Sequence, residues 1–511
     1  MKTKKQYFYN AILLTLVTLL MRTVSVSFNV YVSNWAGAEA MGLLSLVSGV
    51  YGFAVTLATS GIHLATVRTV AERLEQTKGA ENGRCLRACL AYAGFFGTLA
   101  TLLLFLLARP LGCHVLKDER SVRALYVLSF TLLPIALSSV LNGYFTAVRR
   151  AWKNAVVQVA EQGTKISLTS YFLLCIAPKT TEGCLLSILG GGAIAESLSL
   201  VLNLILYLID KRRFKGERTT KKGARIPVAS IALPVAISAY ARSGLLTIEH
   251  ILIPRGLTAY GAGNAAALSA YGCLQGMALP VILYPAAILS SFAALLIPEV
   301  TEQQSANNKK EIRYIAGRVY QLTVLFSIGA AAIMLFLSGE LGRILYDNEE
   351  VSGFIRMLAP LIPIMYMDTA TDAMLKGLGE QVYSMRVNIF DALVSVLCVA
   401  ILVPKLGIYG YVITIYITEI LNAALSITRL LRISGFRPRP FSLLAKPLLS
   451  AVGATCIARL FLYALPGISG AAGLVLHIAV AALFYLLLLH LTGGWRRTDS
   501  QWLLGCFLPS E

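Results

Sequence analysis

Five polar residues recur along the first apolar stretch of the chain, and one of them is charged. Thr15, Thr18, Arg22, Ser25 and Asn29 follow one another at spacings of three and four residues, so a helix places them on one face. The guanidinium of an arginine is a planar fork that donates to two oxygens of an anionic group such as a phosphate. We therefore expect Arg22, Ser25 and Asn29 to bind an anionic ligand.

A second apolar stretch repeats this arrangement. Arg242 is followed seven residues later by Glu249, as Arg22 is followed by Asn29, and Ser238 lies on the same helical face. Placing an ionised side chain inside a membrane costs free energy, so we first interpret such a residue as part of a functional site. Arg242 and Glu249 are therefore further candidates for ligand binding. The alternative for each arginine is a structural ion pair with an acid, for instance Arg242 with Glu249.

His63 is another candidate binding residue, because histidine changes charge near neutral pH. It precedes Arg68 by little more than one helical turn. The alternative is a structural histidine at the membrane interface.

Several acids also lie inside apolar stretches. Asp368, Asp372 and Lys376 recur every four residues and share a helical face, so Asp372 can pair with Lys376. Asp368 is then the better candidate to bind a cation or a proton, and we treat Asp368 and Asp372 as candidate ion-coupling residues. Glu161 and Asp391 lie near the ends of their stretches, and we interpret them as structural.

The stretches that carry these residues are long enough to cross a membrane. Hydrophobic residues make up 57% of the 511 positions, charged residues 14%, and the mean hydropathy is +0.70. These values exclude a soluble enzyme and a disordered chain. A spanning helix needs about 20 apolar residues, and we find fourteen such stretches, near 10–32, 41–66, 88–108, 124–147, 154–177, 184–209, 228–253, 270–297, 314–337, 354–375, 383–403, 408–430, 443–464 and 470–491.

The positive charge of the chain indicates its orientation rather than nucleic-acid binding. The net charge is +19, and the basic residues fall between the apolar stretches. With a cytoplasmic N-terminus, most of the 45 Lys and Arg residues lie on the cytoplasmic side, as the positive-inside rule requires. We expect a multi-pass protein of the cytoplasmic membrane with both termini in the cytoplasm.

The chain contains an internal repeat. The segment that begins at Pro134 resembles the segment that begins at Pro363, with Glu161 at the place of Asp391. Helices one to six and seven to twelve therefore form two parallel copies. We expect an N-terminal lobe over 1–210, a basic cytoplasmic linker over 211–227, a C-terminal lobe over 228–432, and two added helices with a tail over 433–511.

Four segments resemble a known family. They are LLMRTVSVSFNVYVSNWAGAEAMGLLSL, LPVAISAYARSGLLTIEHILIPRGL, GMALPVILYPAAILSSFAALLIPEVTE and MLKGLGEQVYSMRVNIFDALVSVLCVAILVPKLGIYGY. They are similar to the stage V sporulation protein B group of polysaccharide-biosynthesis proteins, within the multidrug/oligosaccharidyl-lipid/polysaccharide (MOP) exporter superfamily. The resemblance implies an all-α membrane protein with two six-helix lobes in a V around a central cavity.

The resemblance also implies a function. The expected activity is translocation of a lipid-linked oligosaccharide, a polyprenyl-pyrophosphate glycan precursor, across the membrane by alternating access. A cation-coupled multidrug exporter of the same superfamily is the alternative, and a membrane enzyme is disfavoured because the outer connections are short. No ATP-binding or metal-binding motif occurs, so we expect no catalysis, cofactor or metal. The expected partners are the lipid-linked substrate, membrane lipids and a coupling cation, with the chain acting as a monomer.

Overall fold

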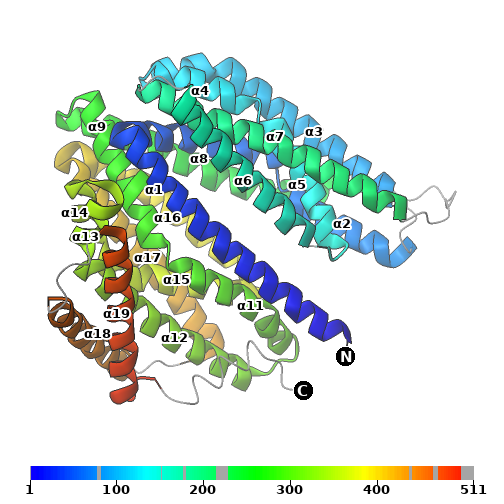
Figure 1. The fold of residues 1–511 in the computed structure, drawn as a ribbon. Helices are drawn as coiled ribbons and strands as arrows, with labels where there is room; N and C mark the ends of the chain where they lie inside the picture. Colours follow the sequence, from blue (N-terminus) through cyan, green and yellow to red (C-terminus); the bar gives the residue numbers. More distant parts are fainter. Residues whose placement is uncertain are drawn as a thin grey trace. The chain divides into compact units, whose positions relative to one another are not determined.

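The structure is a computed structural model that describes residues 2–77, 82–150, 152–176, 180–213, 228–436, 440–463 and 470–495. Every regular element in these residues is a helix, and no strand occurs among them. Figure 1 shows these helices along the chain. The expected all-α fold is therefore confirmed. Most of the expected linker 211–227 lies outside the described residues.

Twelve helical stretches of the described residues are long and apolar enough to cross a membrane. They account for the fourteen expected spans with two differences. The first two expected spans lie in one stretch, Val17–Glu72, and the span expected at 154–177 is not among the twelve. That segment is nevertheless a helix, α6 (Trp152–Cys175). Its hydropathy is lowered by charged residues, including Glu161 and Lys165.

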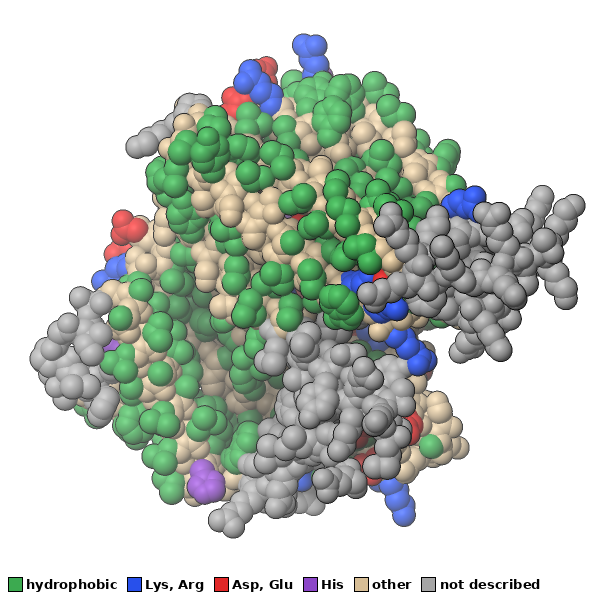
Figure 2. Space-filling model, turned by 45° about the vertical axis from the view of Figure 1, so that its right-hand side comes forward, with side chains coloured by type: hydrophobic (Ala, Val, Ile, Leu, Met, Phe, Trp, Pro, Cys, Tyr) green, Lys and Arg blue, Asp and Glu red, His purple; other side chains and the backbone are tan. Residues whose placement is uncertain are grey.

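The helices expose apolar side chains to their surroundings. Leu106 is 70% exposed, Leu449 72% and Leu460 73%. On the face drawn in Figure 2, hydrophobic side chains are abundant and charged side chains are few. A soluble monomer rarely exposes so much apolar surface. The chain is therefore a multi-pass membrane protein.

The helices pack into two compact units. Unit 1 comprises Met1–Asn34, Gly256–Ala262 and Ala270–Glu511, and unit 2 comprises Trp35–Arg255 and Gly263–Ser269. These boundaries differ from those of the expected lobes in where they place two long helices. The first half of α1 (Lys2–Thr59) belongs to unit 1, and most of α8 (Val228–Tyr260) belongs to unit 2. Each of the two helices begins one copy of the expected repeat.

Unit 2 contains the second half of α1, seven helices between α1 and α8, most of α8 and most of α9 (Asn264–Tyr271). Pro134 is the third residue of α5, where the first helical turn needs no backbone N–H donor. Gly191 of α7 lets Thr169 of α6 approach closely, because a Cβ at this glycine would lie 2.4 Å from the threonine Oγ1. The seven helices between α1 and α8 are α2 (Ile62–Thr77), α3 (Asn82–Pro110), η1 (Leu111–Leu116), α4 (Arg120–Ser129), α5 (Leu132–Ala147), α6 and α7 (Thr181–Arg213).

Unit 1 contains the first half of α1 and the helices that follow α9. Pro363 is the second residue of α15, so the prolines matched by the repeat both lie in the first turn of a helix. Tyr485 of α19 packs on Gly329 of α12 and donates to the Leu325 carbonyl at 2.7 Å. The helices after α9 are η2 (Gly272–Ala278), α10 (Leu279–Leu283), α11 (Ala286–Ser305), α12 (Lys309–Phe336), α13 (Ser338–Tyr346), α14 (Glu349–Leu358), η3 (Ala359–Leu361), α15 (Ile362–Gly377), α16 (Gln381–Leu406), α17 (Ile408–Ser434), α18 (Pro440–Tyr463) and α19 (Gly470–Leu491).

Along α1, the chain passes from unit 1 to unit 2 close to a kink at Gly37. Within α1, Gly37 has φ 78° and ψ 171°, a conformation essentially restricted to glycine. Asn34, before this kink, donates to the Leu345 carbonyl at 2.8 Å within unit 1. Glu39, after it, pairs with Arg120 at 2.8 Å within unit 2. Gly37 therefore separates two segments of α1 that are each held by their own unit.

Candidate functional site

The polar face of the first half of α1 lies in unit 1. Thr18, Arg22 and Ser25 are exposed, and Asn29 is half-buried. In the described part of the chain, no ion pair joins the Arg22 guanidinium to an acid. The structural pair considered for Arg22 is therefore not formed there. An exposed guanidinium without an acid keeps its donors available for an anion.

Two tyrosines lie close to this face. The hydroxyl of Thr23 is 3.0 Å from the hydroxyl of Tyr284, which lies at the break between α10 and α11. Tyr366 of α15 is within electrostatic reach of Arg22, and its hydroxyl donates to the Ile282 carbonyl at 2.7 Å. Both tyrosine hydroxyls are thus engaged within unit 1, while the Arg22 guanidinium is exposed.

Asn29 has an acceptor that the described residues leave unused. Its Oδ1 is buried and has no hydrogen-bond partner among them. A buried amide oxygen without a partner is costly, so this position suits a donor such as a hydroxyl group or a water.

Arg242 lies on α8, within unit 2. Its side chain is exposed, and no described acid pairs with it, so the alternative pair with Glu249 is absent. Glu249 is half-buried and has interactions of its own. Arg242 therefore resembles Arg22 in its exposure and in its lack of an acidic partner within the described residues.

The residues around Arg242 hold α8 against the second half of α1. Thr56 Oγ1 donates to Ser243 Oγ at 3.1 Å, and Thr247 Oγ1 donates to the Gly49 carbonyl at 2.8 Å. His250 also packs on Gly49, where a Cβ would lie 2.8 Å from the histidine Cβ. This seam of hydroxyl groups and small residues fixes the rotation of α8 and thereby the exposed position of Arg242.

His63 belongs to unit 2 as well. It is the second residue of α2, its side chain is exposed, and its Nδ1 lies 3.4 Å from the Ser139 carbonyl of α5. This contact is long for a hydrogen bond. The ring is thus only weakly held.

The two candidate ion-coupling acids have different surroundings in unit 1. Asp372 pairs with Lys376 at 2.6 Å, as the spacing predicts, and also accepts a hydrogen bond from Ser384. Asp368 instead accepts from Asn422 Nδ2 of α17 at 3.4 Å. Asp372 is therefore neutralised by its own helix, whereas Asp368 lies among groups from other helices.

Another acid of unit 1 lies near Asp368. Glu419 of α17 lies within electrostatic reach of Asp368 and also of Asp391 on α16. The described residues contain no group of three or more His, Cys, Asp or Glu side chains placed to hold a metal ion. Asp391 and Glu419 are acids in apolar stretches of the sequence, but only the packing of three helices places Glu419 near both Asp368 and Asp391.

The structure groups the candidate residues by unit. Arg22, Ser25, Asn29, Asp368 and Asp372 belong to unit 1. The other three candidates, Arg242, Glu249 and His63, belong to unit 2. Each candidate arginine thus lies in the compact unit formed mainly by the other copy of the repeat.

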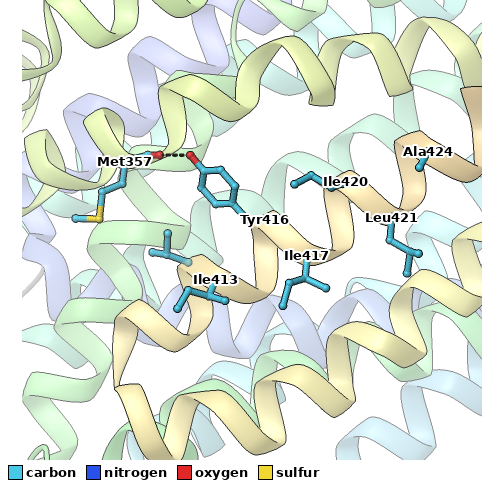
Figure 3. Close-up of a pocket in the computed structure, with 8 residues that line it drawn as sticks. Met357, Ile413, Tyr416, Ile417, Ile420, Leu421 and Ala424 are labelled. Carbon is cyan, nitrogen blue, oxygen red and sulfur yellow. Dashed lines mark hydrogen bonds between the residues drawn. The ribbon is translucent and has the colours of Figure 1, made fainter.

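An apolar groove follows α17 in unit 1. It has a volume of about 710 Å³, and Met357, Tyr416 and Ile420 are among its lining residues. Figure 3 shows Tyr416 pointing toward Met357, to whose carbonyl its hydroxyl donates at 2.6 Å. The remaining lining side chains are aliphatic, namely those of Val412, Ile413, Ile417, Leu421 and Ala424. With its one hydroxyl engaged, this groove suits hydrocarbon.

Comparisons with known families and proteins agree with the resemblance seen in the sequence. The chain matches the family described as polysaccharide biosynthesis protein over residues 8–298, and the family described as MatE over residues 259–401. Stage V sporulation protein B of Bacillus subtilis (strain 168) is 25% identical over 448 residues, which cover 84% of this chain and 85% of that protein. Lipid II flippase MurJ of the same organism is 22% identical over 404 residues, which cover 73% and 72%.

Two solved structures have a similar fold. Lipid II flippase MurJ in an inward closed conformation matches with a TM-score of 0.69 at 12% identity, over 94% of this chain and 98% of that one. A multidrug resistance MATE family transporter of the MOP superfamily, in an inward-facing conformation, matches with a TM-score of 0.64 at 16% identity, over 82% and 98%. The chain therefore has the fold of MOP superfamily transporters, and the expected resemblance is confirmed.

Proposed function

Because the chain belongs to the polysaccharide biosynthesis protein family, we propose that it moves a lipid-linked oligosaccharide across the cytoplasmic membrane by alternating access. The proposed substrate is a glycan precursor on a polyprenyl pyrophosphate. The description of the family as polysaccharide biosynthesis protein and the name of one relative, lipid II flippase MurJ, support this substrate class. The proposal places both termini in the cytoplasm, with the expected lobes at 1–210 and 228–432.

The observation that carries the proposal is the state of Arg22. A polyprenyl-pyrophosphate sugar has an apolar tail, which can stay in lipid, and an anionic head, which needs cationic donors. Arg22 is exposed on a polar helical face, and no ion pair joins it to an acid in the described residues. A guanidinium in this state can pair with two phosphate oxygens. Ser25 and Asn29 add polar groups toward sugar hydroxyls one and two turns further along.

Arg242 has the corresponding role in the proposal. It is also exposed and without an acidic partner in the described part of the chain. Glu249 and His63 supply an acceptor and a titratable ring within the same unit.

The acids of unit 1 favour a second candidate function, a cation-coupled multidrug exporter. Glu419 of α17 lies within electrostatic reach of Asp368 on α15 and of Asp391 on α16. A cationic drug or a coupling cation needs such carboxylates. In the flippase proposal the same acids, with Asp368 foremost, bind the coupling ion instead.

Reconstitution in liposomes distinguishes the two functions. A fluorescent polyprenyl-pyrophosphate oligosaccharide is placed in both leaflets, and a membrane-impermeant quencher reports how fast the inner pool reaches the outside. The flippase proposal expects protein-dependent exchange of this lipid and no pumping of a cationic dye under an ion gradient. A polyprenyl phosphate without the glycan is the control substrate. Dye pumping without glycolipid exchange would overturn the proposal in favour of the exporter.

A further inference from the structure

Helix α7 carries a polar stripe that faces the interior of unit 2. Glu196, Ser199, Asn203 and Asp210 are separated by three, four and seven residues, a spacing that places them on one helical face. Ser199 is 2% exposed, Asn203 0% and Asp210 1%. The stripe, which we call the polar track, is thus buried in the unit although it lies in a membrane-spanning helix.

Asn203 is the centre of the polar track, and its side chain has unmet hydrogen-bonding capacity. Neither its Nδ2 nor its Oδ1 has a partner in the described part of the chain. Burying an amide without partners lowers the stability of the fold. Buried polar groups of this kind are usually satisfied by ordered water. Other unpartnered buried atoms occur on the neighbouring helices of unit 2, at Ser138 Oγ, Asn142 Oδ1 and Thr169 Oγ1.

Three charged groups meet at the Glu196 end of the polar track. Glu196 lies within electrostatic reach of Glu161 and Lys165, both on α6. Tyr51 of α1 is within reach of both carboxylates, and its hydroxyl is 2.6 Å from that of Thr131. Two carboxylates and one ammonium carry one surplus negative charge when all are ionised. An apolar interior disfavours a surplus charge unless a cation or a proton neutralises it.

The other end of the polar track reaches a charged group nearer the surface. Asp210 Oδ1 is 2.5 Å from Lys153 Nζ and 2.5 Å from Arg150 Nη1. Lys153 is nearly buried and also contacts the Leu206 carbonyl at 3.4 Å. The Arg150 side chain is 30% exposed. Buried polar residues of α7 therefore lie at intervals between the Glu196 group and an ion pair that includes the partly exposed Arg150.

We propose that the polar track is hydrated and delivers a proton to the carboxylates of Glu161 and Glu196. The proton enters at the Asp210 end, passes along water held by Asn203 and Ser199, and adds to a carboxylate oxygen of Glu161 or Glu196. It leaves by the same route, so only O–H bonds form and break. The bound proton cancels the surplus negative charge beside Lys165. This proton site belongs to unit 2 and is separate from the acids around Asp368.

Infrared spectroscopy of the full chain in lipid tests whether the proton is bound. A protonated carboxyl group gives a carbonyl-stretch band that a carboxylate lacks. Difference spectra at neutral pH are expected to show loss of such a band in E161Q or in E196Q relative to the unaltered chain. If neither variant loses a carboxyl band, the proton site is overturned. This measurement needs no transported substrate, so its outcome is independent of the proposed function.

Exchange of the carboxyl proton for deuterium shifts this band. The rate of the shift after transfer to D₂O therefore tests whether the polar track carries the proton. N203L replaces the amide with an apolar side chain of similar branched shape and is expected to slow the shift by about tenfold or more, equivalent to a barrier higher by about 1.4 kcal/mol. N203S keeps a polar group and is expected to exchange at the original rate. S187A is the matched control, because Ser187 is a buried residue of α7 off the polar track that donates to the Gly183 carbonyl.

A second substitution guards against a folding defect in N203L. S199V blocks the polar track at its next residue and is expected to slow the shift in the same way. Unaltered exchange in both N203L and S199V, or equal slowing in S187A, would overturn the polar track as the proton route.

Discussion

Thr23 and Tyr284 join the first half of α1 to the break between α10 and α11 through a contact of 3.0 Å between their hydroxyl oxygens. Thr23 Oγ1 already donates to the Leu19 carbonyl at 3.0 Å, so the tyrosine hydroxyl is the donor to the threonine. Pro285 follows Tyr284 and has no N–H for a continuous helix. The break thus positions a tyrosine that fixes α1 one residue after Arg22.

Removing this hydrogen bond is expected to loosen α1. Y284F leaves the ring and deletes the donor, and we expect a loss of about 0.5–1.5 kcal/mol in unfolding free energy, measured by chemical unfolding in detergent. T23V should give a similar loss. The double variant is expected to lose less than the sum of the two single variants, because they remove one shared contact. Y409F is the control, since Tyr409 is 59% exposed; an equal loss in Y409F would contradict the assignment.

Arg22 is expected to be required for transport. R22A should reduce glycolipid exchange in liposomes by about tenfold or more, because one charge-assisted pair with an anion contributes about 1.5–3 kcal/mol. R22K keeps the charge but loses the fork and should retain part of the activity. R68A is the matched control, since Arg68 pairs with Glu72 on a strongly exposed surface. Normal exchange by R22A at normal protein level would remove Arg22 from the site.

Local patterns in the sequence predicted the helices well, and tertiary packing explains most differences. The pair of Asp372 with Lys376 follows from their spacing on one helix and is confirmed. Helix α6 forms as expected although it is not among the apolar spans, and its Thr169 packs closely on Gly191 of α7. Packing of this kind depends on neighbours that the pattern of one helix does not reveal.

The sequence could not predict which residues meet across helices. Glu419, Asp391 and Asp368 lie on three different helices, and periodicity within each helix gives no information on their distance. The exchange of α1 and α8 between the two units was hidden for the same reason. A repeat identifies equivalent helices, but the side chains at the seams, such as Gly49 against His250, decide which unit each helix joins.

Gly37 provides a prediction about the kink in α1. Its φ of 78° and ψ of 171° are strained for any residue with a Cβ, so G37A is expected to cost about 1–3 kcal/mol of stability. No atom lies within 4 Å of the position that this Cβ would take, which makes the backbone the sole source of the cost. G94A is the matched control, because Gly94 lies inside α3 with equally open space.

The two glycine variants should change stability in opposite directions. An alanine inside a helix is favoured over glycine by about 0.5–1 kcal/mol, so G94A should raise the unfolding midpoint in detergent while G37A lowers it. A neutral or stabilising effect of G37A would show that the kink does not need its positive φ.

Glu299, near the end of α11 and beyond the candidate spans, gives a prediction about pH. Partial burial and the nearby carboxylates of Glu311 and Glu302 raise its pKa above the usual 4.5. The folded chain then binds this proton more tightly than the unfolded chain, so ionisation of Glu299 lowers stability as pH rises from about 4.5 through the raised value. E299Q cannot ionise. Its melting temperature in detergent should equal that of the unaltered chain at acid pH and exceed it increasingly toward neutral pH. A difference that is the same at every pH would contradict this linkage. E311Q removes one of the neighbouring charges, and it should raise the melting temperature over the same pH range by less than E299Q does.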